Sequence, residues 1–440
     1  MNQSRQELHE QVVPHQGLEV GDVQFSDLPE VLSPSNLPEV LSPSNLPEVL
    51  SPSDFPEPYH KKGAPEASSK RFIPRLQRRL LIAVVVILIA VAIALSAVLT
   101  NINHSKSTSG QSNSTSNGTF VEGSSLAVTG WRAETDFSIR LFYQGSDDFL
   151  RVSSFESSTG SGWTSATKIT KAKPKTPLAA VSFNQSFYGN GSDIKTRVFY
   201  LDDQNHINEL IFDSANPLGK IGTLSERSIT AASISRLAAY WPSLTYQHAA
   251  NGAIWEVRYN CTTGTADCWN NKPLNISGLD TGFGLAEVPY GRNLSGIFLF
   301  YQRDDNQLIN YAWSSEANNW TIRKFAESVP PSASVAGFST PRARALDALN
   351  FYILWQDTSG DVQMSWMDDT SGWKGPSVIS TAFDGVGNGT AIACLTPSSW
   401  YTSPLQPGTD MSRCYFQANN GKLREVLYNG SDWEFLGNVL

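Results

Sequence analysis

A hairpin pattern recurs six times in the C-terminal part of the chain. Each copy has an apolar strand, usually ending in an aromatic and a polar residue, then a turn and a second short strand. The copies begin at Arg140, Arg197, Ser243, Phe298, Tyr352 and Arg413. The aromatic residues at the fourth position lie 46 to 61 residues apart. A β-rich repeat of roughly 50 residues is typical of a propeller blade. The pattern therefore predicts an all-β fold, a six-bladed β-propeller over residues 124–440.

Short runs of small apolar residues precede the clearest copies, at residues 125–128, 178–183 and 237–241. Small side chains allow the inner strands of neighbouring blades to lie close together around a central channel. An aromatic content of 11% and frequent Gly and Pro also suit many short strands joined by tight turns. A propeller collects its ligands in the clefts between blades, so function depends on which clefts keep polar and aromatic side chains.

The composition excludes several classes of function. The net charge is −8, and no basic stripe of the kind that a nucleic-acid-binding protein needs is present. The six histidines form no metal-ligand pattern in the sequence, and no Gly-x-Ser-x-Gly nucleophile motif occurs. We therefore expect no nucleic-acid partner and no cofactor.

Residues 80–99 form an uncharged run in which only Ser96 is polar. A helix of this length crosses a bilayer, and the run is too long and too far from the N-terminus for a signal peptide. Basic residues cluster on its N-terminal side, at Lys70, Arg71, Arg75, Arg78 and Arg79. The positive-inside rule then predicts a single-pass type II membrane protein, with a cytosolic N-terminus and an extracellular or lumenal propeller.

Glycosylation sequons and cysteines agree with that topology. Beyond the run, sequons begin at Asn103, Asn113, Asn117, Asn184, Asn190, Asn260, Asn275, Asn293, Asn319, Asn388 and Asn429. All four cysteines also lie beyond it. Of the three possible pairings we predict the two local disulfides, Cys261–Cys268 and Cys394–Cys414, because disulfides persist in an oxidising compartment. Free buried thiols are the alternative.

Four regions follow along the chain. Residues 1–79 contain three copies of a proline-rich nonapeptide, beginning at residues 28, 37 and 46, and are predicted to be a disordered cytosolic tail. The repeats are either a spacer or, through their Ser-Pro pairs, phosphorylation sites. Residues 80–100 are the expected transmembrane helix. Residues 101–123 are rich in Ser, Thr and Asn, which indicates a flexible stalk, and residues 124–440 form the propeller.

An arginine and a glutamate recur at one spacing in two repeats. Arg197 and Glu209 are twelve residues apart, as are Arg413 and Glu425. A hairpin with its tip near Asp203 would place the first pair directly opposite each other on one face of the sheet. Fixed donors beside a carboxylate suit the adjacent hydroxyls of a sugar, and an aromatic ring could stack on its C–H surface. An ordinary surface ion pair is the alternative.

These features together resemble the fungal fucose-specific lectins, over about residues 124–440. Blades of that family carry an Arg-x-aromatic-aromatic-Gln run with a Glu twelve residues after the Arg, preceded by a Leu-Ala-Ala-Val-type strand. The resemblance implies a six-bladed propeller in which each sugar lies between two blades. Arg and Glu come from one blade, and an aromatic residue and a terminal Trp come from the next.

The resemblance implies two ligand-binding sites in this chain. Their residues are Arg197, Glu209, Tyr259 and Trp269 between the second and third blades, and Arg413, Glu425, Phe155 and Trp163 across the ring closure. The other four repeats lack at least one partner. The residues at their Arg and Glu positions are Arg140 and Val152, Ser243 and (displaced by one) Glu256, Phe298 and Asn310, and Tyr352 and Met364. We expect these four clefts not to bind in the family manner.

The sequence therefore predicts a membrane-anchored carbohydrate-binding protein, not an enzyme, with fucosylated or related glycans as partners. Its oligomeric state is left open. One alternative is a degenerate propeller that serves as a scaffold for a protein partner. The other is a glycoside hydrolase or a sialidase-like enzyme, because propellers host those too. Hydrolysis needs two carboxylates flanking one bond, whereas the recurrent carboxylates here lie beside arginines.

Overall fold

The computed structural model describes residues 120–440, apart from residues 134, 185–192, 262–267, 275, 277–283, 292–294, 343–347, 380 and 398–407. The predicted tail (1–79), the spanning segment (80–100) and most of the stalk (101–119) lie outside the described residues. No helix among the described residues has the length and apolar character to cross a membrane. The anchor and its topology therefore stay predictions.

Six antiparallel sheets of four strands each make up the described part of the chain. The first three are built from consecutive strands. Blade one holds β1 (Leu126–Ala133), β2 (Asp136–Gln144), β3 (Phe149–Glu156) and β4 (Thr167–Lys171). Blade two holds β5 (Ala179–Asn184), β6 (Ile194–Leu201), β7 (Ile207–Asp213) and β8 (Asn216–Ile221). Blade three holds β9 (Leu237–Tyr240), β10 (Ser243–Gln247), β11 (Ile254–Tyr259) and β12 (Trp269–Pro273).

The other three sheets follow the same order. Blade four holds β13 (Leu285–Pro289), β14 (Gly296–Gln302), β15 (Gln307–Ser314) and β16 (Asn319–Ser328). Blade five holds β17 (Val335–Pro341), β18 (Leu349–Gln356), β19 (Val362–Met367) and β20 (Lys374–Val378). Blade six holds β21 (Ile392–Cys394), β22 (Arg413–Gln417), β23 (Leu423–Tyr428) and β24 (Trp433–Asn438). Two short 3₁₀ helices, Thr223–Arg227 and Thr381–Phe383, lie after β8 and β20.

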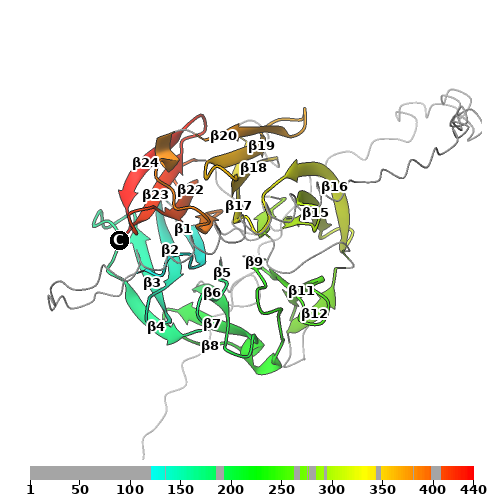
Figure 1. Ribbon diagram of the computed structural model, residues 1–440. Coiled ribbons are helices and arrows are strands. Elements are labelled where there is room, and N and C mark those ends of the chain that lie inside the picture. Colours follow the sequence, from blue (N-terminus) through cyan, green and yellow to red (C-terminus); the bar gives the residue numbers. More distant parts are fainter. Residues whose placement is uncertain are drawn as a thin grey trace, which may run out of the picture. The chain divides into compact units, whose positions relative to one another are not determined.

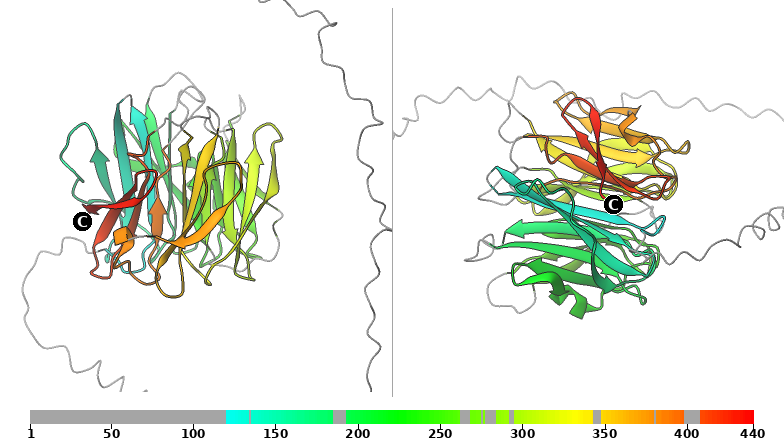
Figure 2. Two further views of the ribbon diagram at one scale, coloured as in Figure 1. Left: turned by 90° about the horizontal axis from the view of Figure 1, so that it is seen from above. Right: turned by 90° about the vertical axis from the view of Figure 1, so that its left-hand side faces the viewer.

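The sheets form a closed ring. The first strand of each blade contacts the first strand of the next, and β1 of blade one contacts β21 of blade six. In Figure 1 the labels β5 and β9 lie near the centre of the ring and β8, β12 and β20 at its edge. Figure 2 shows the blades standing side by side. The six-bladed propeller predicted from the repeats is confirmed, and each repeat forms the second strand of its blade.

Aromatic and aliphatic side chains of the second and third strands fill the spaces between blades. Phe199 of blade two, for example, packs in one buried cluster with Leu244 and Val257 of blade three. The chain folds this way because neighbouring sheets pack face to face, so a strand in the middle of a blade is covered on both sides. All five residues of β10 and all seven of β14 are accordingly buried.

The polar residue that ends most repeats joins blades together. Gln144 donates from Nε2 to the carbonyl of Lys173 at 2.9 Å, beyond the end of its own blade. Gln302 donates to the carbonyl of Pro330 at 2.7 Å, and Gln356 to that of Gly387 at 3.1 Å. These glutamines satisfy carbonyls in the connections between blades, which explains why a polar residue recurs at a buried position.

Both predicted disulfides are present. Cys394 and Cys414 face each other directly on β21 and β22, and Cys261 and Cys268 close a short loop after β11. No free cysteine is left in the chain, so the alternative of free thiols is wrong. The Cys394–Cys414 disulfide joins β21, the innermost strand of blade six, to β22 at the point where the ring closes.

Candidate functional site

The strand register differs from the prediction by two residues in both hairpins. Arg197 pairs with Ile211, and Glu209 pairs with Phe199. In blade six, Arg413 pairs with Leu427 and Tyr415 with Glu425. The predicted directly opposite placement of arginine and glutamate is therefore wrong.

The cause is the turn. In blade two the strands end at the paired residues Leu201 and Ile207, so the turn is centred on Gln204 and not on Asp203. Alternate residues of a strand share a face, so Arg197 and Glu209 still lie on one face as diagonal neighbours. The long arginine side chain bridges the diagonal, and Nη1 of Arg197 donates to Oε1 of Glu209.

The four residues predicted across the ring closure come together, and we name them the sixth-blade cluster (Arg413, Glu425, Phe155 and Trp163). Arg413 Nη1 donates to Glu425 Oε1 at 2.7 Å, and Trp163 of blade one donates from Nε1 to Glu425 Oε2 at 2.9 Å. The Arg413 guanidinium carbon lies 5.0 Å from the centroid of Phe155. Residues from the two ends of the propeller thus share one carboxylate.

Two further contacts fix this cluster. Arg413 donates from Nε to the carbonyl of Asp410 at 2.7 Å, and the Tyr415 hydroxyl donates to Glu425 Oε1 at 2.9 Å. Burial, together with the Glu425 carboxylate, raises the pKa of Tyr415 well above its ordinary value, so the phenol stays a neutral donor. Neither contact was predicted from the sequence, although Tyr415 is part of the repeat itself.

The sixth-blade cluster reaches the surface through its aromatic residues. The side chains of Arg413 and Glu425 are 11% and 7% exposed, while Phe155 and Trp163 are half-buried. Among the described residues, Arg413 Nη2 has no hydrogen-bond partner. A rigid cluster with a carboxylate, a donor and two partly exposed rings is chemically suited to hold a small polyol.

The four residues predicted between blades two and three also meet, and we name them the second-blade cluster (Arg197, Glu209, Tyr259 and Trp269). The Arg197 guanidinium carbon lies 4.6 Å from the centroid of Tyr259 and 5.2 Å from that of Trp269. Glu209 Oε2 also accepts from the backbone N–H of Leu224 at 3.1 Å.

Two aromatic residues that the sequence analysis missed enclose the second-blade cluster. Phe183 and Trp241 stack with their ring centroids 3.9 Å apart, and both lie within about 5 Å of the Arg197 guanidinium, at 5.2 and 4.8 Å. The Arg197 side chain is 6% exposed and that of Glu209 is fully buried. This cluster is closed in the structure, so its cation is held by aromatic faces. Trp241 follows directly on the small-residue strand β9, the one sequence signal for it.

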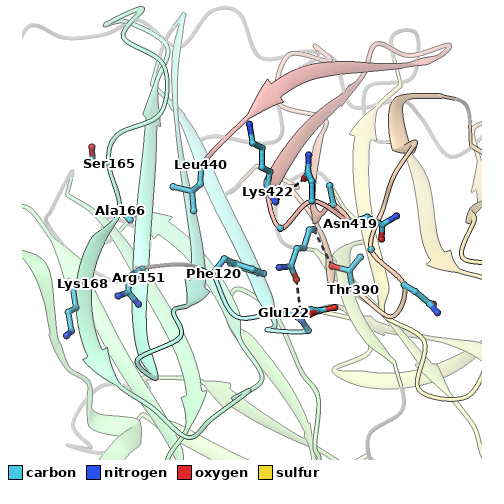
Figure 3. A pocket seen from close by; sticks show the side chains of 17 residues that line it. Phe120, Glu122, Arg151, Ser165, Ala166, Lys168, Thr390, Asn419, Lys422 and Leu440 are labelled. Carbon is cyan, nitrogen blue, oxygen red and sulfur yellow. Dashed lines mark hydrogen bonds between the residues drawn. The ribbon is translucent and has the colours of Figure 1, made fainter. Parts of the chain in front are cut away.

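A cavity of about 970 Å³ lies between blades one and six, at the turn that joins β22 and β23. Its walls include Phe120, Arg151, Lys168, Asn419 and Lys422 (Figure 3). None of the eight predicted site residues lines it. Arg151 is also occupied, because it forms an ion pair with Asp147 at 2.7 Å. The cavity is therefore separate from both clusters.

The described residues hold no group of three or more His, Cys, Asp or Glu side chains that could bind a metal ion. Within the sixth-blade and second-blade clusters a single carboxylate is present in each. Glycoside hydrolysis needs a carboxylate on each side of the scissile bond. The geometry of these clusters is suited to binding and not to hydrolysis.

A six-bladed ring with arginine–glutamate–aromatic clusters between its blades is the arrangement expected of a propeller lectin from the resemblance described above. The family model for the fungal fucose-specific lectins matches residues 97–244 and 195–420 of the chain. The chain belongs to this family, which confirms the resemblance seen in the sequence. The chain is therefore a lectin and not an enzyme.

Individual lectins are similar to most of the chain. The fucose-specific lectin of Aleuria aurantia is 24% identical over 330 residues, covering 71% of this chain and 94% of that protein. The crystal structure of the Aleuria aurantia lectin, described as a six-bladed β-propeller, matches with a TM-score of 0.58 at 19% identity, covering 73% of this chain and 97% of that one. The SapL1 lectin in complex with α-methyl fucoside matches with a TM-score of 0.55 at 18% identity, covering 72% and 96%.

Proposed function

We propose that the propeller binds fucosylated or related glycans, and that the sixth-blade cluster is its principal site. The observation that carries this proposal is the Arg413–Glu425 pair, set beside the half-buried rings of Phe155 and Trp163. The guanidinium donates to hydroxyl oxygens of the sugar, Glu425 accepts from hydroxyl protons, and a ring covers the apolar face. The relatives that match most of the chain are named fucose-specific lectins.

The second-blade cluster is proposed as a second, weaker site. A sugar there would have to separate the stacked rings of Phe183 and Trp241 before it reached Arg197. Binding then costs the loss of that contact, about 0.5–1.5 kcal/mol for an aromatic pair. The enclosure of this cluster also favours the alternative, a propeller that has lost most sugar sites and serves as a scaffold for a protein partner.

The proposal predicts that Arg413→Ala lowers the affinity for α-methyl fucoside by at least about tenfold, because a hydrogen bond to a charged group contributes roughly 1.5–3 kcal/mol. Titration calorimetry on the purified protein measures the affinity. Arg424→Ala is the matched control, since Arg424 neighbours Glu425 on β23 but lies on the opposite face of the sheet.

Arg413→Lys keeps the charge if Arg413→Ala fails to fold, and it should also weaken binding, because lysine lacks the planar fork of donors. The same titration with Arg197→Ala reports on the second-blade cluster and should give a smaller loss. Unchanged affinity in both arginine variants would show that these clusters are not the sugar sites. A wild-type protein that binds no glycan but captures one protein partner would support the scaffold.

We also propose that residues 80–100 anchor the protein as a single-pass type II membrane protein, with residues 1–79 in the cytosol and 101–123 as a stalk. Eleven sequons after residue 100, against one at Asn2, support this orientation. We expect the full-length protein, expressed in eukaryotic cells, to gain mobility in electrophoresis after enzymatic removal of N-glycans. An Asn2→Gln variant should behave identically. A protein that carries no N-glycan, or carries one only on Asn2, would contradict the orientation.

A further inference from the structure

Glu256 of blade three occupies the same position in its sheet as Glu209 and Glu425 occupy in theirs. In β10 and β11, Glu256 pairs with Thr245, the third residue of its repeat. Glu209 and Glu425 likewise pair with the third residues of their repeats, Phe199 and Tyr415. The sequence analysis placed Glu256 one residue out of position, and this was wrong.

Turn length explains the discrepancy. The blade-three turn runs from residue 248 to 253 between the paired residues Gln247 and Ile254, whereas the blade-two turn runs from 202 to 206. The former holds six residues and the latter five. One extra residue in the turn increases the sequence spacing and leaves the position in the sheet unchanged.

The arginine of this blade has moved to the neighbouring strand. Ser243 stands where the other clusters have arginine, and the residue paired with Ser243 across the ladder is Arg258. Arg258 lies two residues from Glu256 on the same face of β11, and it donates from Nε to Glu256 Oε1 at 2.7 Å. Ser243 donates from Oγ to the same oxygen at 3.0 Å. Blade three therefore also has a guanidinium beside its carboxylate, although Arg258 comes from a different position in the sequence than Arg197 and Arg413.

Blade four completes the arrangement with two tryptophans. Trp320 donates from Nε1 to Glu256 Oε2 at 3.2 Å, as Trp163 does to Glu425 Oε2. The Arg258 guanidinium carbon lies 3.7 Å from the centroid of Trp313. Trp313 and Trp320 pair with each other, as Phe155 and Trp163 do in blade one.

We name these residues the third-blade cluster (Arg258, Glu256, Trp313 and Trp320). Trp313 is 8% exposed, and its Nε1 has no hydrogen-bond partner among the described residues. A buried donor without a partner costs free energy that an acceptor on a ligand would recover. The cluster therefore has the parts of the sixth-blade cluster and one unused donor.

A second cation distinguishes this cluster from the other two. Lys272 of β12 pairs with Glu256 across the ladder, and its Nζ lies 3.6 Å from Glu256 Oε2. Its side chain is 42% exposed, so it marks where the cluster reaches solvent. Among the described ion pairs, Glu209 and Glu425 each have one arginine partner and no lysine. Two cations lie beside Glu256, whereas one lies beside Glu425. The nearby Glu287 carboxyl, which also contacts Ser243, is protonated at neutral pH because burial raises its pKa to about 8, so the two cations outweigh the Glu256 carboxylate.

We propose that the cleft between blades three and four is a third carbohydrate site, which takes a sugar bearing a carboxylate, such as a uronic or sialic acid. Arg258 and Glu256 hold ring hydroxyls, and Lys272 pairs with the sugar carboxylate at the rim. This inference rests on the proposed function, since it assumes that inter-blade clefts of this propeller bind sugars. It adds a site that the spacing of the repeat did not predict and assigns it a different ligand class.

The test is a titration of the purified protein with N-acetylneuraminic acid and with methyl glucuronide, in parallel with α-methyl fucoside. Lys272→Gln should weaken binding of an acidic sugar about fivefold or more and leave fucoside binding unchanged. Lys220→Gln is the matched control, because Lys220 is an exposed lysine on the outer strand of blade two. Trp320→Phe, which removes the donor to Glu256 and keeps an aromatic ring, should weaken the acidic sugar as well.

Each outcome separates the two proposals. Fucoside binding without binding of either acidic sugar overturns the third site and leaves the proposed function standing. Acidic-sugar binding that survives Lys272→Gln, or that is lost in Arg413→Ala, also overturns it, because the ligand then occupies another cleft. Absence of binding for all three sugars contradicts the proposed function itself.

Discussion

Replacing Glu256 with alanine is expected to lower the free energy of unfolding by about 3–5 kcal/mol, because it leaves a buried cation without its partner. Glu256 is fully buried and accepts hydrogen bonds from Arg258, Ser243 and Trp320. Its removal leaves the Arg258 guanidinium, with an 11% exposed side chain, against Trp313 without the carboxylate to which it donates. Chemical denaturation of the purified wild-type protein and the variant measures the difference.

Two comparisons separate the unpaired charge from simple loss of packing. Asp305→Ala removes one partner of the exposed Arg303–Asp305 pair, and it should change stability far less. The double variant Glu256→Leu with Arg258→Met replaces both charges by apolar side chains and should recover much of the stability. If that double variant is as unstable as Glu256→Ala, the loss arises from packing and the unpaired-charge explanation is wrong.

The repeats predicted the fold well, because they report a property that every blade must share. A strand buried on both faces needs consecutive apolar residues, and its turn and connection need polar ones, so each blade repeats the same run. The six runs fall on β2, β6, β10, β14, β18 and β22, and the predicted start at residue 124 lies two residues before β1.

The register was not predictable from spacing, because it depends on turn geometry. The blade-two turn is centred on Gln204, and within it Asn205 has a φ of 64°, the left-handed region that an asparagine tolerates. That conformation leaves no mark on the spacing between arginine and glutamate, and the longer turn of blade three changes the spacing without changing the position of Glu256 in the sheet. The predicted residues still met in space, since an error of two residues keeps a side chain on its original face.

The third-blade cluster was missed for a related reason. Its arginine lies on the third strand of the blade, so a search for arginine at the start of the repeat does not find it. A usable signal was present: Glu256 and Arg258 are charged residues at alternate positions of a strand that is otherwise apolar, which places both on one buried face.

Glu287 of blade four is another buried glutamate, and it contacts the third-blade cluster through Ser243. It lies on β13 and lines a small cavity of about 40 Å³ together with residues of several other inner strands. Its Oε2 accepts from the backbone N–H of Tyr240 at 2.8 Å, and its Oε1 lies 3.2 Å from Ser243 Oγ. Burial, reinforced by the Glu256 carboxylate, raises the pKa of Glu287 to about 8. A protonated Glu287 fits this geometry, because it can donate to Ser243 while Ser243 donates to Glu256.

The raised pKa predicts that the propeller loses stability as the pH rises from about 4.5 to about 8. In that range the folded state keeps the proton on Glu287 while the unfolded chain has released it, so unfolding is favoured by rising pH. The loss approaches about 1.4 kcal/mol for each pH unit within the window and stops above it. Glu287→Gln, which keeps an acceptor for Tyr240 and cannot titrate, should remove this slope.

Denaturation curves at several pH values between 4 and 9 measure this pH dependence of the free energy of unfolding. The contribution of Glu287 is the difference between the wild type and Glu287→Gln, since other groups titrate equally in both. Glu434→Gln, at an exposed position on β24, is the control for removing a carboxylate and should follow the wild type. Parallel curves for the wild type and Glu287→Gln would show that Glu287 is already ionised in the folded propeller. The single hydroxyl proton of Ser243 would then lie between two carboxylates, and Ser243 could donate to Glu287 or to Glu256 but not to both.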